Sequence, residues 1–400
     1  MYAEQLPLAG PVIARRVTGL NHSPVRQLLA LSARPDVISF AGGFPAPELF
    51  DVDGLRAGFA EALADPSVRR NLQYSATEGN AELRELLAER LTRRGLSTGA
   101  SDLLTTNGSQ QALTMLTTAL VDPGDVVLVA APTYLAALQC FHLAGARVVP
   151  VAGDAHGIAP DALTEACRRY RPSLLYLIPT FANPTGHTMP LDRRRELAEV
   201  ARRHSVWIVE DDPYGELRYR GEHLPPVAAL PEAGEATVYV GSFSKTSAPG
   251  LRLGWVRAPG SLRRTLMLVK EAADLHSSTV DQAAAAVYLR TADLDGHLRA
   301  VVAQYRDRCS AMLDKLPSVL PPGSRWTSPE GGMFVWVRLP DGADASHVLT
   351  RAVDLGVAFV PGSAFYPVDP DHATLRLSFT TNTPDQISTG LSRLREALRQ

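Results

Sequence analysis

Short apolar segments alternate with amphipathic helical patterns over residues 103–257. The apolar segments are rich in Val, Ile and Leu without polar alternation, which is typical of strands covered on both faces. The predicted strands are residues 103–106, 126–130, 148–151, 174–178, 206–210 and 238–241. Between them, apolar residues repeat at helical spacing over residues 112–120, and residues 191–203 follow a proline that can start a helix. This alternation predicts an α/β domain with a mostly parallel sheet between helices.

The pattern changes after Gly260. A long helical region is predicted from Leu262 to about Leu316, ending at Pro317, and Pro-Pro-Gly at residues 321–323 breaks the chain. Three later apolar runs lie at residues 333–337, 357–360 and 375–379. With helical patterns between them, they predict a smaller α+β domain, against which the first forty-odd residues are expected to pack. The predicted units are an N-terminal segment (1–45), a large domain (46–290) and a small C-terminal domain (291–400).

Composition and charge narrow the classes of function. The chain has 400 residues, of which 45% are hydrophobic and 20% charged, which is ordinary for a globular protein. A formal net charge of -2 provides no overall field to hold nucleic acid or an acidic membrane. Basic runs such as Arg193-Arg194-Arg195 lie in helical patterns, and we interpret them as solvent-exposed faces. We therefore expect neither a nucleic-acid nor a membrane partner.

The cysteines and the N-terminus bear on location. Cys140, Cys167 and Cys309 form no Cys-x-x-Cys pair, so neither a zinc site nor a redox motif is predicted, and no metal is expected. A sparse, odd count suits a reducing compartment. Residues 1–10 lack a basic start followed by an apolar stretch, and no apolar run reaches membrane-spanning length. A cytoplasmic location is expected.

An apolar strand delivers Lys245 onto a loop of small hydroxyl residues. A lone Ser-Lys pair is usually a solvent-exposed turn. Here Ser242, Ser244 and Arg252 bracket the lysine with hydroxyl donors and a fixed cation, which are groups that a phosphate monoester needs. A lysine that forms an imine with an aldehyde must also spend time deprotonated, which nearby cations and burial favour. The cluster suggests a lysine that reacts with an aldehyde beside a phosphate.

A glycine turn and a helix start follow the predicted strand at residues 103–106. Residues 106–112 read Thr-Asn-Gly-Ser-Gln-Gln-Ala, and the helix is predicted to begin at Ser109 or Gln110. Free N–H groups and the positive end of the helix dipole suit an anion there. A simple N-cap is the commoner role for a serine at such a position. Both interpretations stay open for Ser109.

Asp211 and Tyr214 follow the strand predicted at residues 206–210. Strand ends often carry acidic residues, so a single aspartate is weak evidence. Pyridoxal chemistry, however, needs a carboxylate opposite the ring nitrogen, because a protonated nitrogen makes the ring an electron sink. Tyr214 could bond the phenolic oxygen of that ring. Tyr134, on the loop after residues 126–130, could lie over the ring face or be an ordinary half-buried aromatic residue.

Two further segments carry candidate polar groups. Residues 181–186 read Phe-Ala-Asn-Pro-Thr-Gly, and their Asn-Pro-x-Gly is also good turn chemistry. Arg376 lies inside the apolar run at residues 375–379, where a charge is costly unless it is paired. Bidentate capture of a substrate α-carboxylate would pair it, and a structural ion pair is the alternative.

Taken together, these elements resemble the fold-type-I, class I and II aminotransferases, which depend on pyridoxal 5'-phosphate (PLP). Asn-Pro-x-Gly, Asp-x-x-Tyr, Ser-x-Ser-Lys and the distal arginine stand in the order of that family, and the match runs from about Arg26 to Phe379. The chain is most similar to the α-aminoadipate and kynurenine branch, through residues 39–45, 73–79, 108–112 and 331–336. The resemblance implies a large domain with a mostly parallel seven-stranded sheet between helices, plus a smaller α+β domain.

The resemblance also implies roles for the reacting groups. Lys245 would form the Schiff base with PLP and then move the proton between the substrate and the cofactor. Asp211 would pair with the pyridine nitrogen, while Asn183 and Tyr214 would hold the phenolic oxygen. Tyr134 would stack on the ring.

The remaining implied contacts concern the phosphate, the substrate and a second subunit. The phosphate would be surrounded by Ser109, Gln110, Ser242, Ser244 and Arg252, with Gln111 as a further cofactor-binding residue. Arg376 and Asn183 would take the α-carboxylate, near the backbone of Gly42 and Gly43. Tyr74 would reach into the site of the neighbouring subunit, which implies a homodimer.

Arg26 bears on the class of substrate. By resemblance it matches an arginine that the aminoadipate branch uses for an acidic side chain, and an exposed helix arginine is the alternative. Residues 270–278 keep the spacing of that branch but differ at several positions near the substrate pocket. The expected donor is an L-amino acid of the 2-aminoadipate, glutamate or aromatic kind, and the expected acceptor is a 2-oxo acid such as 2-oxoglutarate.

Two other functions are weighed against transamination. Decarboxylation, elimination or an oxidase-like reaction would use the same lysine and aspartate. A regulator that senses PLP would carry a DNA-binding helix-turn-helix in front of this domain. The forty-odd residues before Gly42 are too few for that module and a linker, and the net charge is not basic. An aminotransferase is therefore predicted.

Overall fold

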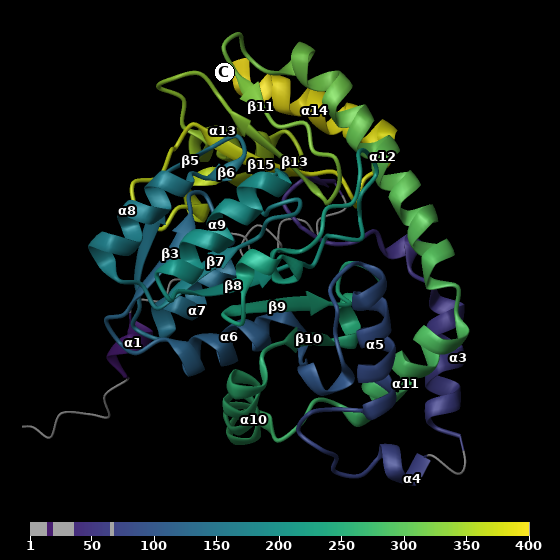
Figure 1. Ribbon diagram of the computed structural model, residues 1–400. Helices are drawn as coiled ribbons and strands as arrows, with labels where there is room; N and C mark the ends of the chain where they lie inside the picture. Colours follow the sequence, from purple (N-terminus) through teal and green to yellow (C-terminus); the bar gives the residue numbers. More distant parts are fainter. Residues whose placement is uncertain (1–13, 19–35, 65–67, 400) are drawn as a thin grey trace, which may run out of the picture.

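A seven-stranded sheet forms the centre of the chain in the computed structural model, which describes residues 14–18, 36–64 and 68–399 (Figure 1). In spatial order its strands are β2 (Leu103–Thr106), β10 (Gly254–Arg257), β9 (Thr237–Ser242), β8 (Trp207–Asp211), β7 (Leu174–Leu177), β3 (Val126–Ala130) and β4 (Arg147–Val151). The neighbours from β9 to β4 are all parallel, whereas β10 is antiparallel to both β2 and β9. The predicted α/β architecture is confirmed.

Different helices cover the two faces of this sheet. On one face lie α6 (Gly108–Leu120), α7 (Leu135–Leu143) and α10 (Gly260–Asp274), and on the other α8 (Pro160–Tyr170) and α9 (Leu191–Arg203). Side chains alternate along a strand, so β3 sends Val127 and Val129 into the core beneath α6 and α7. It sends Val126 and Leu128 into the core beneath α8 and α9. Burial on both faces explains why the strand sequences are apolar throughout.

Strand β10 was not predicted from the sequence, because Gly-Trp-Val-Arg is short and combines apolar residues with a glycine and a charged residue. It fills the gap between β2 and β9, and its Gly254 pairs with Thr106 on one side and Ser242 on the other. A Cβ atom at Gly254 would lie 2.8 Å from backbone atoms of both Gly108 and Gly241, so only glycine fits. The strand therefore joins the ends of β2 and β9, one on each of its edges.

A second, antiparallel sheet lies beyond the first. Its order is β11 (Arg325–Trp326), β12 (Phe334–Arg338), β15 (Thr374–Ser378) and β14 (Val360–Pro361). A separate parallel pair joins β1 (Ile38–Ser39) to β13 (Val357–Ala358). Residues 38 and 39 thus pair with this part of the chain, whereas α1 (Arg15–Thr18) contacts α7, and the apolar run at 357–360 divides between two sheets. The domain boundaries after residues 45 and 290 stay predictions.

The long helical region divides into three helices, α10, α11 (Thr279–Thr291) and α12 (Leu294–Val319). α12 runs along the side of the molecule toward α14 (Pro384–Arg399) (Figure 1). Pro317 lies inside the last turn of α12, so the predicted helix end at Pro317 was two residues early. Because proline has no backbone N–H, the carbonyl oxygen of Leu313, four residues earlier, receives no helical hydrogen bond from Pro317.

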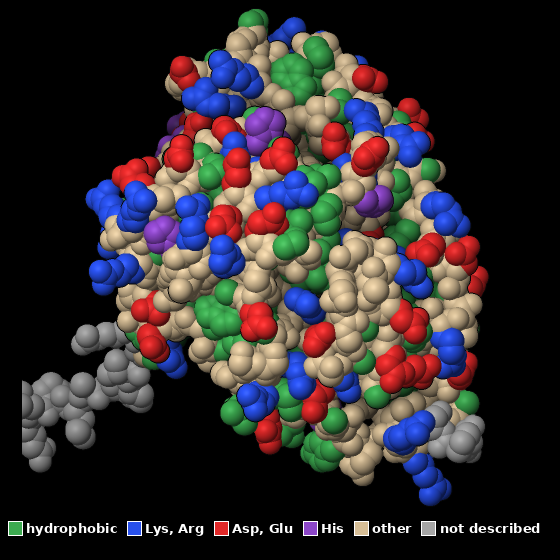
Figure 2. Space-filling view, viewed as in Figure 1, with side chains coloured by type: hydrophobic (Ala, Val, Ile, Leu, Met, Phe, Trp, Pro, Cys, Tyr) green, Lys and Arg blue, Asp and Glu red, His purple; other side chains and the backbone are tan. Residues whose placement is uncertain are grey.

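The other elements connect these layers. The helices are α1 (Arg15–Thr18), α3 (Val52–Ala62), α4 (Val68–Asn71), α5 (Ala81–Arg93) and α13 (Ala345–Asp354), and β5 (Gly153–Asp154) pairs with β6 (Gly157–Ile158). The 3-10 helices are η1 (Pro47–Leu49), η2 (Ala100–Asp102), η3 (Val227–Ala229), η4 (Pro231–Ala233), η5 (Pro249–Leu251) and η6 (Gly362–Phe365). Acidic and basic side chains are interspersed over the face in Figure 2. Within the described residues, no helix is long and apolar enough to cross a membrane.

One basic run differs from its predicted role. Arg194 is fully buried, although the run at residues 193–195 was expected to be a solvent-exposed face. Its guanidinium donates to the carbonyl oxygens of Met189, Pro225 and Pro179 and to the hydroxyl of Thr180, at 2.9–3.0 Å. These acceptors lie on the loops that flank Asn183. The buried charge is retained because it satisfies loop oxygens that no helix or strand reaches.

Candidate active site

A cavity of about 430 Å³ opens where β7, β8 and β9 end. Ligands of open α/β sheets bind at this edge, because the carboxyl ends of the parallel strands and the loops that follow them meet there. The cavity brings together most of the predicted site residues, namely Gly43, Ser109, Gln110, Tyr134, Asn183, Asp211, Tyr214, Ser242, Ser244, Lys245, Arg252 and Arg376. They come from positions spread over more than 300 residues of sequence.

Asp211 is the last residue of β8, and its carboxylate lines the cavity with only one of its two oxygens hydrogen-bonded. Its Oδ2 accepts a hydrogen bond from the hydroxyl of Tyr176 at 2.7 Å, whereas its buried Oδ1 has no partner. Burial raises the pKa of Asp211 to about 7, the Tyr176 hydroxyl opposes this, and Asp212 adds to it. A buried oxygen without a partner is costly, so this atom is placed to take a donor from a ligand. A protonated ring nitrogen is such a donor.

Lys245 lies on the loop after β9 and faces the same cavity. Its Nζ donates to the carbonyl oxygen of Gly43 at 3.0 Å. Burial lowers the pKa of Lys245 to about 8, and the nearby Arg376 and Arg252 lower it further, while Asp211 opposes them. A larger fraction of the amine is therefore free near neutral pH than for an ordinary lysine, as a nucleophile that attacks an aldehyde requires.

Hydroxyl groups and one arginine form an anion-binding end of the cavity. The hydroxyl of Ser242 donates to that of Ser244 at 3.0 Å, and the backbone N–H of Ser244 donates back to Ser242 at 3.1 Å. Arg252, which follows η5 on the segment before β10, donates to the carbonyl oxygen of Asn107 at 3.4 Å. Hydroxyls and a guanidinium that converge in this way suit a phosphate.

The first turn of α6 completes that end. α6 begins at Gly108 with Asn107 in the N-cap position, so Ser109 lies inside the helix and its interpretation as an N-cap was wrong. Gly108 has a φ of +73°, and a Cβ there would lie 2.8 Å from Nη2 of Arg252. The glycine thus lets the helix start approach the arginine, and the free N–H groups of the first turn face an anion together with it.

Arg376 from β15 forms the opposite end of the cavity. Its guanidinium donates to Asn183 Oδ1 and to the carbonyl oxygen of Ala41, each at 2.7 Å, and its buried Nε has no partner. The guanidinium carbon lies 4.3 Å from the ring centre of Phe334 and 4.9 Å from that of Phe365. Burial lowers the pKa of Arg376 to about 10. No carboxylate of the described residues forms an ion pair with it, so a substrate carboxylate is the better explanation than a structural pair.

The two tyrosines that were predicted to contact the ring also line the cavity. Tyr214 hydrogen-bonds with Asn183, and burial raises the pKa of Tyr214 well above its ordinary value. Tyr134 directly precedes α7, and burial raises its pKa to about 12. Both phenols are therefore neutral donors over the physiological pH range.

Three of the predicted residues that the structure describes are not part of the cavity lining. Gln111 binds Lys270 and Asp274 behind the helix start, and Gly42 is buried next to Gly43. Tyr74 is 77% exposed, with its ring 5.8 Å from that of His276. Arg26 lies outside the described residues.

Sequence reasoning missed two residues of the site. Tyr176 is fully buried in β7 and orients Asp211. A tyrosine in the middle of an apolar strand needs a partner for its hydroxyl, and this was the available signal. Phe334 lines the cavity between Arg376 and Tyr214, whose ring it meets edge-on at 5.9 Å. It follows the Gly-Gly-Met segment that carried the resemblance, without any chemical group to mark it.

Comparison with known proteins agrees with this geometry. The family model for aminotransferase class I and II matches residues 58–394. Aromatic-amino-acid aminotransferase 1 of Thermococcus litoralis is 41% identical over 393 residues, covering 97% of this chain and 94% of that protein. The 2-aminoadipate transaminase of Thermus thermophilus is 40% identical over 382 residues, covering 95% and 94%. A solved kynurenine aminotransferase of Pyrococcus horikoshii, in complex with PMP, has a TM-score of 0.91 at 39% identity and covers 97% of this chain and 96% of that one.

The residues of the cavity also match the chemical groups of the cofactor. PLP carries an aldehyde, a basic ring nitrogen and a phosphate. The lowered pKa of Lys245 suits attack on the aldehyde, and the buried oxygen of Asp211 that has no partner can bind the ring nitrogen. Arg252, together with the nearby hydroxyl groups and the start of α6, can bind the phosphate. The geometry and the comparisons therefore agree, and the chain belongs to the class I and II aminotransferases, enzymes that depend on pyridoxal 5'-phosphate.

Proposed function

We propose that this enzyme moves the amino group of an L-amino acid with an acidic or aromatic side chain to a 2-oxo acid such as 2-oxoglutarate, in two half-reactions. The observation that carries the proposal is the placement of Lys245, the free oxygen of Asp211 and Arg376 around one cavity. An amino acid and its oxo acid share the α-carboxylate that Arg376 can bind. One cavity therefore serves both half-reactions.

Each residue has a separate task in this chemistry. When bound, PLP supplies an aldehyde and an electron-withdrawing ring. Lys245 would hold the cofactor through its amine and, once displaced by the substrate, would move the proton between the α-carbon of the substrate and the C4′ carbon of the cofactor. Asp211 would keep the ring nitrogen protonated, and Tyr214 with Asn183 would donate to the phenolic oxygen. Arg376 fixes the carboxylate, so that the α-hydrogen is presented to the amine.

Two observations support a substrate with an acidic or aromatic side chain. The T. litoralis relative is named for aromatic amino acids and the T. thermophilus relative for 2-aminoadipate. Phe44, which is 46% exposed, and Phe334 line the cavity, and apolar rings suit an aromatic or aliphatic portion of a substrate. Arg26, outside the described residues, remains the proposed partner for an acidic end.

We further infer that two copies of the chain assemble. Tyr74, Leu72 and Leu275 are 77%, 66% and 50% exposed, and the ring contact of Tyr74 with His276 places all three on one region of the surface. Exposed apolar side chains that gather in this way are typical of a contact surface. Sedimentation measures the assembly, and a fully active monomer would contradict it. A cytoplasmic location is proposed from the cysteine usage.

The absorption spectrum of the purified protein tests the reaction. Glutamate, 2-aminoadipate or an aromatic amino acid should convert the visible band of the bound cofactor into that of the aminated form, and 2-oxoglutarate should restore it. Lys245→Ala should abolish multiple turnovers, whereas Lys315→Ala, with the same change on α12, should retain them. Normal turnover by Lys245→Ala would refute the mechanism.

Product analysis separates the competing functions. Transamination keeps the carboxylate and leaves aminated cofactor, whereas decarboxylation releases carbon dioxide and elimination releases the side-chain group. A cofactor band that no amino acid converts would favour a regulator that senses PLP. Conversion by aromatic but not by acidic amino acids would remove the proposed role of Arg26.

A further inference from the structure

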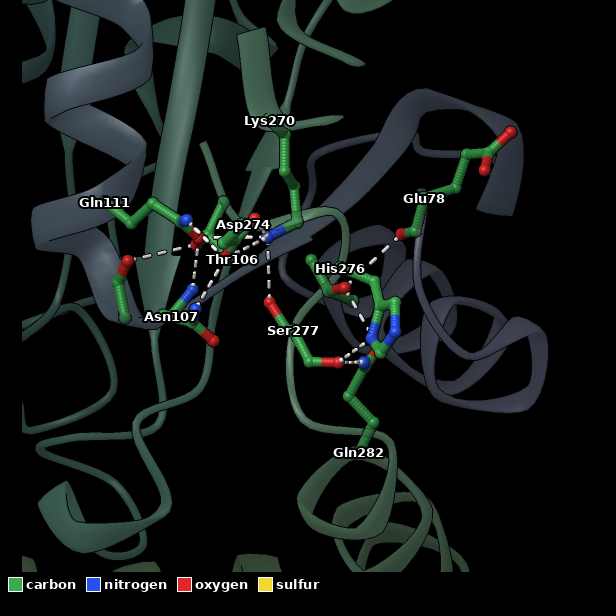
Figure 3. A network of polar contacts seen from close by, with 11 residues as sticks. Glu78, Thr106, Asn107, Gln111, Lys270, Asp274, His276, Ser277 and Gln282 are labelled. Carbon is green, nitrogen blue, oxygen red and sulfur yellow. Dashed lines mark hydrogen bonds and ion pairs between the residues drawn. The ribbon is translucent and has the colours of Figure 1, made fainter. Parts of the chain in front are cut away.

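Lys270 in α10 carries a buried charge outside the cavity (Figure 3). Its side chain has no exposed surface, and its Nζ lies 2.9 and 3.0 Å from the two carboxylate oxygens of Asp274. The same amine donates to Gln111 Oε1 at 3.0 Å and to the hydroxyl of Ser277 at 3.1 Å. An ammonium has three donors, and three acceptor groups surround this one.

The choice of lysine at this position fits its geometry. The chain has only three lysines, Lys245, Lys270 and Lys315, among its 40 Lys and Arg residues. A compact ammonium fits between three converging acceptors, whereas the larger planar guanidinium of arginine does not. Burial lowers the pKa of Lys270, and the Asp274 carboxylate opposes that change. A lysine at position 270, in a chain whose basic residues are almost all arginines, therefore matches the small space between the three acceptors.

The network around Lys270 ends on the turn before α6. Asp274 Oδ2 accepts from Asn107 Nδ2 and from Gln111 Nε2, each at 2.6 Å. Gln111 Oε1 accepts from the backbone N–H of Asn107 at 2.7 Å. The carbonyl oxygen of Asn107 accepts from Arg252. Asn107 is thus held at its amide, its side chain and its carbonyl, and the next two residues begin the helix that faces the phosphate.

We propose that Lys270 is a positioning residue for the phosphate of PLP, acting through Asp274 and Gln111 on the turn at Asn107. Lys270 neutralises Asp274, whose side chain is 21% exposed and could otherwise turn toward water. Turning away would release Asn107 and Gln111 together. The N–H groups at the start of α6 would then lose their alignment with Arg252. The proposal rests on the cofactor assigned above.

Comparing PLP with pyridoxal, which lacks the phosphate, isolates this role. Equilibrium dissociation constants of both are measured on cofactor-free protein by fluorescence quenching. Lys270→Met should weaken PLP binding by about 10-fold, as residues that orient binding groups from behind typically do. Its affinity for pyridoxal should change by less than about 2-fold, because pyridoxal makes no contact that depends on the turn. Lys315→Met, the same change on α12, should alter neither.

A second variant guards against simple misfolding. Lys270→Met leaves the Asp274 carboxylate without its cation and can lower the melting temperature. Lys270→Met with Asp274→Leu removes both charges and should recover stability, yet still bind PLP about 10-fold more weakly while keeping its affinity for pyridoxal. This loss of phosphate preference without a loss of stability is the result expected from a positioning role.

Three outcomes would overturn the proposal. Equal weakening of PLP and pyridoxal would show that Lys270 supports the fold in general. An unchanged preference for PLP in Lys270→Met, or its return in the double variant, would show that the turn does not need the pair. An unaltered chain that binds PLP no more tightly than pyridoxal would overturn both the cofactor assignment and the role of Lys270.

Discussion

The hydroxyl of Tyr176 controls the charge of Asp211, and Tyr176→Phe removes it without leaving a cavity. The hydroxyl donates to Oδ2 at 2.7 Å within a fully buried pair. A hydrogen bond to a charged group contributes ~1.5–3 kcal/mol, and a change of one in pKa corresponds to about 1.4 kcal/mol. The change should therefore raise the pKa of Asp211, which is about 7 in this structure, by about 1–2.

Measuring kcat/KM as a function of pH tests this change in the pKa of Asp211. An acid whose pKa is raised stays protonated up to a higher pH, so the acid limb of the profile should move to higher pH. At neutral pH less of the carboxylate is ionised to hold the proton of the ring nitrogen, and kcat/KM should fall by about 10-fold. Tyr170→Phe, at the end of α8 and outside the cavity lining, is the matched control and should leave the profile unchanged.

Two results would refute this reasoning. An acid limb and a neutral kcat/KM that both stay within about 2-fold of the unaltered enzyme would show that the hydroxyl does not set the charge of Asp211. A uniform loss at every pH, with the limb in place, would mean that Tyr176 matters for packing alone.

Two further predictions concern other groups of the site, and a third concerns the buried Arg194. The rate at which cofactor-free enzyme captures PLP should rise with pH through a midpoint near 8, because burial lowers the pKa of Lys245 to about 8 and only the free amine attacks the aldehyde. Stopped-flow rates that rise only near pH 10 or above would contradict this prediction. Arg376→Lys should raise KM for the amino acid and the oxo acid alike by about 10-fold, because lysine cannot make the bidentate contact, and a rise for one substrate only would exclude a shared clamp. Arg194→Met should lower the free energy of unfolding by ~3 kcal/mol in urea titrations, since four oxygens lose the guanidinium and, among the described residues, only that of Pro179 keeps another donor, the N–H of Met189. Arg195→Met, at a half-exposed side chain, should change it little.

Much of the site could be predicted because its residues stand where apolar strands end. Asp211 ends one buried strand and Lys245 follows another, and the carboxyl ends of parallel strands meet at one edge of the sheet whatever the conformation of the loops. Arg376 was visible as a charge inside an apolar strand, where only a partner could justify it.

The remainder depends on contacts that no local pattern contains. Gln111 was predicted to bind cofactor, yet consecutive helix residues point about 100° apart, so Gln110 lines the cavity and Gln111 faces Lys270 instead. Asp274 lies four residues after Lys270 on α10, a spacing that the sequence does show, but Gln111 comes from α6, 159 residues earlier in the chain. Arg194 could not be told from Arg193 and Arg195 by sequence, because only the tertiary position of α9 decides how far each of the three arginines is buried.

Strand β10 has a consequence for the order in which the molecule is made. Gly254 is the shared neighbour of Thr106 and Ser242, so the two halves of the phosphate end adjoin only through this strand. A chain that emerges from the ribosome N-terminus first presents β2 and β9 with the gap between them unfilled and two strand edges exposed. Those edges are satisfied only once residues 254–257 have been synthesised. We therefore expect the phosphate end to form only in chains whose sheet has closed, so that capture of PLP would report that residues 254–257 have joined the sheet.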